Sequence, residues 1–310
     1  MIPPITFEEL QTKAFELGWD DIGVTQATIP EADIAAYEAW LQAGYHAELK
    51  WMENRMRTDP TTLLPGAKSA ILFVTYYKQP KVDFQADGGV IASYARGRDY
   101  HHVHRKRLKK FIHWLEERSG QSSIAKGFSD SSPILEKALA VQAGLGWFGK
   151  NTLLIHRQFG TFILLSGLLT TLEFTYAKME LRLPRCGTCT RCIDACPTQA
   201  LVNPYILDAN LCLSYHLIES KKQIPEEIRK KNPGYIFGCD ICQDACPHNW
   251  RKKDSTAEEF MVDKGIGEFL TLKDLDDLAL TPEKLYGTPL KRRGIAGLKH
   301  TLGEETFDGC

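Results

Sequence analysis

The sequence lacks the features that mark membrane-spanning, exported or nucleic-acid-coating proteins. No stretch approaches the roughly 18 consecutive apolar residues that cross a bilayer as a helix. The segment from Met1 to Leu10 has neither the basic nor the apolar part of a signal peptide. Acidic and basic residues number 39 and 38, a formal net charge of −1, so no overall field attracts nucleic acid. We therefore expect a globular cytoplasmic protein that enters no membrane.

Cysteine, by contrast, is concentrated in one part of the chain. The first run has the spacing Cys-x-x-Cys-x-x-Cys-x-x-x-Cys-Pro, which is typical of two-cluster ferredoxins. In such proteins three thiolates bind one 4Fe–4S cluster and the fourth binds its neighbour. A second run, Cys-x-x-Cys-x-x-x-Cys-Pro, has Ile236 where its first ligand would stand, and Cys212 between the runs completes the count. The sequence predicts one cluster on Cys186, Cys189, Cys192 and Cys246, and the other on Cys196, Cys212, Cys239 and Cys242.

Other interpretations of the cysteine pattern have less support from the sequence. The ninth, Cys310, is left over, and we expect it to have no role. Eight thiolates could also hold two zinc ions, but zinc sites usually separate two Cys-x-x-Cys pairs by a longer loop. A disulfide framework would require an oxidising compartment and usually a small secreted chain.

The rest of the sequence predicts an α+β fold. A length of 310 residues suggests about two domains. Helix and strand patterns alternate to about residue 176, which indicates a layered α/β first domain. We expect domains over 1–180 and 181–254, the second ferredoxin-like, and a helical tail over 255–310 that packs on the other two. The predicted helices cover 6–18, 31–43, 102–117, 132–143, 197–201, 225–230 and 271–280, and the predicted strands 21–25, 70–77, 89–94, 151–156 and 161–170.

Two adjacent clusters form an electron wire, so the first domain should hold the acceptor. No Gly-x-Gly-x-x-Gly follows a strand there, and a dinucleotide-binding domain is therefore not indicated. The segment from Asp130 to Asn151 begins Asp-Ser-Ser-Pro and ends Gly-Leu-Gly-Trp-Phe-Gly-Lys-Asn, and it resembles the signature of the epoxyqueuosine reductases. The resemblance extends over about residues 5 to 300. Further matching motifs are RTDP at 57–60, LPGAKS at 64–69, YARGRDYH at 94–101, and Cys212 between the cysteine runs.

The resemblance implies an enzyme that reduces epoxyqueuosine to queuosine at the wobble position of a tRNA anticodon. It implies cobalamin as the acceptor, two 4Fe–4S clusters, and an external one-electron donor such as a ferredoxin or flavodoxin; we expect a monomer. Many members continue into helical HEAT-like repeats, whereas this sequence ends soon after Leu298, so a short form is expected. Reductive dehalogenases share the cofactor plan, but they usually carry a twin-arginine leader and use a tyrosine as acid. A plain iron–sulfur electron carrier is the other alternative.

The same resemblance suggests residue roles. Asp130 is the expected general acid, with a pKa that burial should raise, although an aspartate before Ser-Ser-Pro could equally cap a helix. Arg57 and Lys150 should lie near phosphate, amide or ribose groups of cobalamin. The weaker candidates for cofactor contact are Asn151 and Leu154, which could be ordinary strand residues, and Ser214 and Tyr215, which follow a cluster ligand.

Histidines and basic clusters remain to be placed. Asp99-x-His101 begins like the motif of histidine-ligated cobalamin proteins, but His104 replaces its glycine. The family is held to bind cobalamin without a histidine, so we expect His101, His102 and His104 at the surface or facing tRNA. Each basic cluster alone is typical of a solvated face, and together they could bind tRNA phosphates: 105–110, 221–222, 229–231, 251–253 and 291–293.

Overall fold

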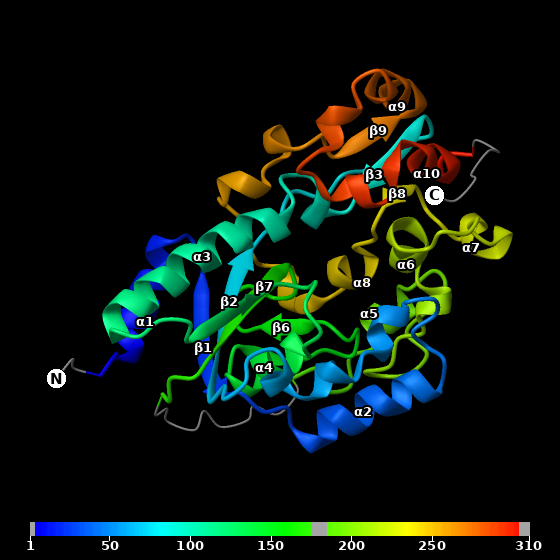
Figure 1. Ribbon diagram of the computed structural model, residues 1–310. Coiled ribbons are helices and arrows are strands. Elements are labelled where there is room, and N and C mark those ends of the chain that lie inside the picture. The colour runs from blue at the N-terminus through cyan, green and yellow to red at the C-terminus, as the bar shows by residue number, and fades with distance from the viewer. Residues whose placement is uncertain (1–3, 175–184, 304–310) are drawn as a thin grey trace.

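The computed structural model describes residues 4–174 and 185–303, so Cys310 lies outside the described residues. The chain has the expected mixture of helices and strands (Figure 1). The helices are α1 (Phe7–Glu16), α2 (Glu31–Gln42), α3 (Tyr100–Ser119), α4 (Glu136–Gln142), α5 (Arg191–Asp194), α6 (Leu213–Ile218), α7 (Glu226–Lys230), α8 (Ile241–Asp244), α9 (Leu272–Ala279) and α10 (Gly294–Thr301). The strands are β1 (Asp21–Gln26), β2 (Ser69–Tyr76), β3 (Gly88–Ile91), β4 (Ala125–Phe128), β5 (Gly146–Phe148), β6 (Leu154–His156), β7 (Ile163–Thr170), β8 (Tyr235–Phe237) and β9 (Phe269–Thr271).

A four-stranded antiparallel sheet, in the order β1-β2-β7-β4, forms the centre of the first domain. Strand β2 is buried on both faces. Its Ile71 and Phe73 pack with α1 and α3, whereas Leu72 and Val74 pack with α4 on the opposite face (Figure 1). Double coverage explains why this strand reads as a continuous apolar run rather than an alternating one.

Local signals fix the ends of the principal helices. Thr6 Oγ1 accepts a hydrogen bond from the Glu9 N–H at 3.2 Å, and Glu9 Oε2 accepts one from the Thr6 N–H at 2.8 Å. This capping box confirms the predicted start of α1. Helix α3 ends at Gly120, whose φ of 68° suits the left-handed conformation that closes a helix.

A second, smaller sheet joins all three predicted domain ranges. Strand β3 pairs in parallel with β8 from the cysteine-rich region and antiparallel with β9 from the tail. The tail, which was expected to be helical, contains α9 and α10 and also supplies a strand at 269–271. Behind this sheet, α9 and α10 contribute Leu275, Leu278 and Leu298 to a core that also contains Ile91 and Phe237.

Three predictions need correction. Helix α4 begins at Glu136 rather than at 132, because 130–135 form bends that include a left-handed Asp130. Residues 197–201 are not helical; the short helix of that region is α5, which precedes them. Strands β4 and β5 were missed because glycine within them weakens the strand signal. Within 4–174 and 185–303, no helix is long and apolar enough to span a membrane.

Candidate active site and cluster-binding module

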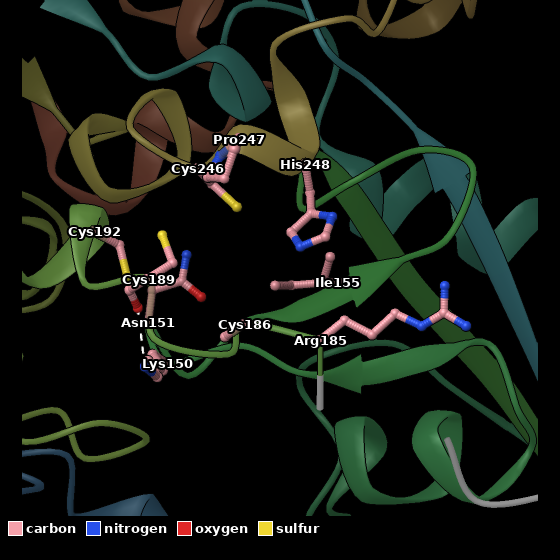
Figure 2. Close-up of a pocket in the computed structure, with 10 residues that line it drawn as sticks. All are labelled: Lys150, Asn151, Ile155, Arg185, Cys186, Cys189, Cys192, Cys246, Pro247 and His248. Carbon is pink, nitrogen blue, oxygen red and sulfur yellow. Dashed lines mark hydrogen bonds between the residues drawn. The ribbon is translucent and has the colours of Figure 1, made fainter. Parts of the chain in front are cut away.

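Four thiols surround one pocket at the edge of the cysteine-rich module (Figure 2). We call this set the first thiol group: Cys186, Cys189, Cys192 and Cys246. Cys192 lies on α5. Cys246 lies two residues beyond the end of α8, after the C-cap residue Ala245. Burial raises the pKa of Cys246 to about 11, and the three other thiols add to the effect. Four thiols around a common space fit a cluster, whose cationic iron stabilises the thiolates that burial otherwise disfavours.

The remaining four thiols form the second thiol group, Cys196, Cys212, Cys239 and Cys242. Burial raises the pKa of Cys242 well above its usual value, and the nearby thiols of the three others raise it further. Backbone N–H groups act in the opposite sense: those of Tyr215 and Ser214 bond to Cys212 and stabilise its thiolate. These are the two sets of four that the sequence predicts, and the binding of one cluster by each set stays a prediction.

An unpaired indole supports the fit of a cluster beside the first thiol group. Trp147 on β5 packs against Cys246, Ile155 and Cys186. Its buried Nε1–H has no hydrogen-bond partner in the described part of the chain. Buried donors are nearly always paired, so a sulfur of the bound cluster would complete this site.

Lys150 and Asn151 attach the first domain to both cysteine loops. Lys150 Nζ donates hydrogen bonds to the carbonyl oxygens of Gly187 at 2.7 Å and Cys189 at 3.0 Å. Asn151 Nδ2 donates to the carbonyl oxygen of Cys242 at 3.4 Å. Both residues therefore lie at the cysteine loops, and their expected contact with cobalamin stays a prediction.

Two other predicted contact residues are largely packed into the protein. Leu154 is buried in the core beneath the central sheet, as expected of an ordinary strand residue. Tyr215 is also buried, and its hydroxyl accepts a hydrogen bond from the Glu48 N–H at 3.3 Å. Ser214 remains half-buried beside it on α6.

Asp130 forms one end of a hydrogen-bonded chain of ionisable groups. His101 Nε2 lies 3.2 Å from Asp130 Oδ2, and His101 Nδ1 lies 2.7 Å from Asp99 Oδ1. The Asp130 N–H donates to Glu136 Oε1 at 2.5 Å, which joins the start of α4 to the loop. Asp130 has a φ of 56° and does not cap α4, whose N-cap is Leu135. The alternative of a simple helix cap does not fit this geometry.

The expected direction of the Asp130 pKa is wrong. Although the side chain is 63% exposed, desolvation by the surrounding protein would raise the pKa of Asp130. The hydrogen bond and positive charge of His101 outweigh this effect, so the pKa is lowered. Burial likewise opposes protonation of His101, yet Asp130 and Asp99 raise its pKa to about 9. Burial, reinforced by the charge of Asp130, raises the pKa of Glu136 to about 8. At neutral pH the proton therefore resides on His101, which the sequence-based prediction did not include in the catalytic site. The Asp99-x-His101 spacing was its visible signal.

Further charged groups surround Asp130 and Glu136. Arg57 is buried and donates from Nε to the Trp51 carbonyl oxygen at 3.2 Å, and its charge lowers the pKa of Glu136. Lys137 Nζ donates to the Thr152 carbonyl oxygen at 2.8 Å, and desolvation lowers its pKa. Such a gathering of charged and polar groups fits a large ligand with many polar groups, as cobalamin is.

The histidine prediction holds only in part. His102 is exposed, whereas His104 is fully buried between Thr75 Oγ1 and Ser129 Oγ, at 3.1 Å from each. Burial lowers the pKa of His104 to about 3, so it is a neutral residue of the core.

Two basic clusters also contain structural arginines. Arg107 is buried, and its guanidinium donates to the Gly18 carbonyl oxygen at 2.6 Å and to Glu259 at 3.0 Å. Arg293 is buried as well and donates to the Ser220 carbonyl oxygen. Neither guanidinium is available to phosphate, which corrects the expectation for clusters 105–110 and 291–293.

Aromatic contacts connect the second thiol group with the Asp130 site. A side-chain carbon added at Gly238, next to Cys239, would lie 3.3 Å from the ring of Tyr94. The rings of Tyr94 and Tyr100 meet edge to face at 6.3 Å, and Tyr100 stacks on His101 at 4.1 Å. Two packed tyrosine rings therefore link the loop of the second thiol group with the ionisable chain at Asp130.

Fold and site together define a two-cluster iron–sulfur oxidoreductase with a hydrogen-bonded chain of ionisable groups at Asp130. Residues 57–131 match the family model described as "Epoxyqueuosine reductase QueG, DUF1730", and 185–249 match that of a 4Fe-4S double cluster binding domain. The epoxyqueuosine reductase of Cellulophaga algicola is 38% identical over 299 residues, which cover 94% of this chain and 95% of that protein. The chain belongs to the epoxyqueuosine reductase family.

Solved structures agree with this assignment. A crystal structure of epoxyqueuosine reductase with an epoxyqueuosine-modified tRNA stem loop has a TM-score of 0.84 and 29% identity, covering 95% of this chain and 79% of that one. The Bacillus subtilis enzyme, with a catalytic aspartate loop swung out of the active site, has a TM-score of 0.82 and 28% identity over the same shares. Membership brings the cofactors of the family, two 4Fe–4S clusters and cobalamin, and the thiol groups and charged site described above fit them.

Proposed function

We propose that this chain reduces the epoxide of epoxyqueuosine in a tRNA anticodon to the alkene of queuosine. The overall change consumes two electrons and two protons and releases the epoxide oxygen as water. The observation that carries the proposal is the Asp99–His101–Asp130 chain, because the rings of Tyr100 and Tyr94 link this proton source to the loop of the second thiol group. One chain forms the whole arrangement, so we take the monomer as the working unit.

The two thiol groups would hold the two clusters in the membership that the sequence predicts, and the clusters would supply single electrons taken from an external donor. Cobalamin, when bound, supplies a cobalt centre that can accept these electrons and act on the epoxide. Arg57, Lys137 and Glu136 would hold its polar groups. We assign cobalamin binding to the domain 1–180 and cluster binding to the domain 181–254. The tail 255–310 borders the site through Arg292, whose charge lowers the pKa of Asp130.

Asp130 transfers the proton and His101 restores it. His101 gives its Nε2 proton to Asp130 Oδ2, and Asp130 passes it to the epoxide oxygen as the carbon–oxygen bond breaks. Asp99 holds the imidazole in position and stabilises its charge from the other nitrogen. A second proton, taken from solvent, completes the water.

The substrate must reach Asp130 as an unpaired base. Single-stranded anticodon loops allow this, since their bases can unstack and enter a protein pocket. The tRNA-bound relative supports such a substrate, and the Bacillus subtilis relative supports an aspartate on a loop that can move. Here Asp130 likewise lies on a loop, between β4 and α4.

Replacing Asp130 by asparagine tests the proposal. Asp130→Asn keeps the size of the side chain but removes the carboxylate that relays the proton from His101 to the epoxide oxygen, so turnover should fall roughly 100-fold or more. Iron content, cobalamin content and thermal stability should stay near wild type. Asp83→Asn, an exposed loop substitution, is the matched control and should retain full turnover. Near-normal epoxide reduction by Asp130→Asn would remove Asp130 as the proton donor.

A further inference from the structure

The first thiol group lies at the periphery of the protein. Cys186 and Cys189 are each flanked by exposed residues along 185–191. The second group is more enclosed: Cys239 lies between buried Gly238 and Asp240. An electron arriving from outside therefore meets the first group before the second.

Cations surround this peripheral group. Arg185 lies over the ring of Trp147 at 5.9 Å, and Lys252 follows four residues after His248 of the pocket wall. Arg191 lies 4.5 Å over the ring of Trp250.

These cations frame an exposed aromatic side chain. Trp250 is 55% exposed, although it is large and apolar, and Arg251 follows it directly on the surface. Asp194 is the acidic residue of α5, and its carboxylate accepts a hydrogen bond from Thr190 at 2.8 Å. A charged rim around an accessible tryptophan is typical of a protein-binding surface. We call this set the outer surface: Arg185, Arg191, Trp250, Arg251 and Lys252.

We propose that the outer surface is the docking site of an acidic one-electron donor protein. Complementary charge would guide the donor to the first thiol group and raise the rate of encounter. The inference rests on the proposed function in one respect, because it requires that the first thiol group hold a cluster. tRNA is the other polyanion, but its modified base has to reach Asp130, which Tyr100 and Tyr94 link to the loop of the second thiol group.

Charge reversal on the outer surface tests the inference. The variant Arg185→Glu/Arg191→Glu/Arg251→Glu is compared with Lys221→Glu/Lys230→Glu/Lys231→Glu, three exposed reversals away from the cysteine pocket. Each protein, loaded with clusters but without tRNA, is mixed anaerobically with a reduced acidic 2Fe–2S ferredoxin, and cluster bleaching is followed by stopped flow. Reduced methyl viologen, a small cation, serves as the second donor. Binding of an anticodon stem loop and iron content are measured on the same samples.

At low salt, the ferredoxin rate should fall at least about tenfold in the outer-surface variant, and high salt should slow the wild type similarly. In the outer-surface variant, the rate of reduction by methyl viologen, the iron content and the stem-loop affinity should stay within about twofold of the wild-type values. An unchanged ferredoxin rate, or an equal loss in the control variant, would overturn the proposal, and loss of stem-loop binding instead would make the surface an RNA site. Should the triple variant lose iron, Arg191→Gln/Arg251→Gln replaces it under the same criteria. Because no epoxyqueuosine is present, the result is independent of whether the chain reduces that base.

Discussion

Asp130 combines a left-handed backbone with an ion pair to His101. A φ of 56° is uncommon for a residue other than glycine, and such conformations concentrate at functional sites. The conformation directs the Asp130 N–H to Glu136 while the carboxylate meets His101. The carboxylate is 63% exposed, so a substrate can reach it without displacing protein atoms.

His101 should govern the alkaline limit of activity. Its pKa is raised to about 9, so turnover should decline as pH rises through about 9 and the proton store empties. His101→Gln should lower turnover by roughly tenfold or more and abolish that decline. Since the folded pKa exceeds the unfolded value of about 6.5, His101 stabilises the fold fully below about pH 6.5 and loses this contribution as pH rises through about 9.

Turnover and urea unfolding, measured between about pH 6 and 10 on wild type and His101→Gln, provide the check. An identical alkaline limb in both proteins would show that the imidazole is not the proton store. His102→Gln, an exposed neighbour, is the matched control and should behave as wild type.

Single cysteine replacements should separate the two clusters. Cys212→Ser should remove the cluster of the second thiol group and lower iron from about eight to about four per chain. Cys246→Ser should affect the first group instead, and Cys310→Ser should leave iron unchanged. Iron analysis with electron paramagnetic resonance of the reduced protein distinguishes these results, and full iron in Cys212→Ser would contradict its role as a ligand.

At the scale of elements, the sequence predicted what local patterns determine. The apolar run of β2 and the capping box of α1 are visible in consecutive residues, and both were found where expected. Strand β9 is only three residues long, and its partner β3 lies almost 180 positions earlier, so no local pattern reveals it. The ligand set followed from cysteine spacing, whereas the protonation of Asp130 depended on His101, 29 residues away.

The tail should be integral to stability because α9 and α10 bury leucines behind β3 and β8. Leu298 is fully buried, so Leu298→Ala should lower the free energy of unfolding by about 2–5 kcal/mol. Leu280 in the same tail is 83% exposed, and Leu280→Ala should change it by less than about 0.5 kcal/mol. Equal effects in denaturant titrations would show that the tail is not part of the cooperative core.

At the scale of the whole molecule, a net charge of −1 conceals local basic surfaces. Binding of an anticodon stem loop should weaken steeply with salt, because each phosphate contact releases counterions. The exposed members of clusters 105–110 and 291–293 include Arg105, Lys106 and Lys291, which remain available. Their combined reversal to glutamate should reduce affinity at least about tenfold and flatten the salt dependence.

Fluorescence titration at several salt concentrations measures this effect, with Lys273→Glu, on the exposed face of α9, as the control. Unaltered affinity in the triple variant would identify these side chains as solvated surface only. The overall placement of charge could not be predicted from sequence, because it depends on which arginines are used to join distant segments.

The turn between β5 and β6 also constrains how the chain can vary in length. Lys150 binds the loop of the first thiol group and Asn151 the loop of the second, so two consecutive residues set the position of both. An insertion here would move both clusters relative to the catalytic domain at once. The α3–β4 connection at 120–124 has no such double attachment, and added residues there would leave the electron-transfer distances intact.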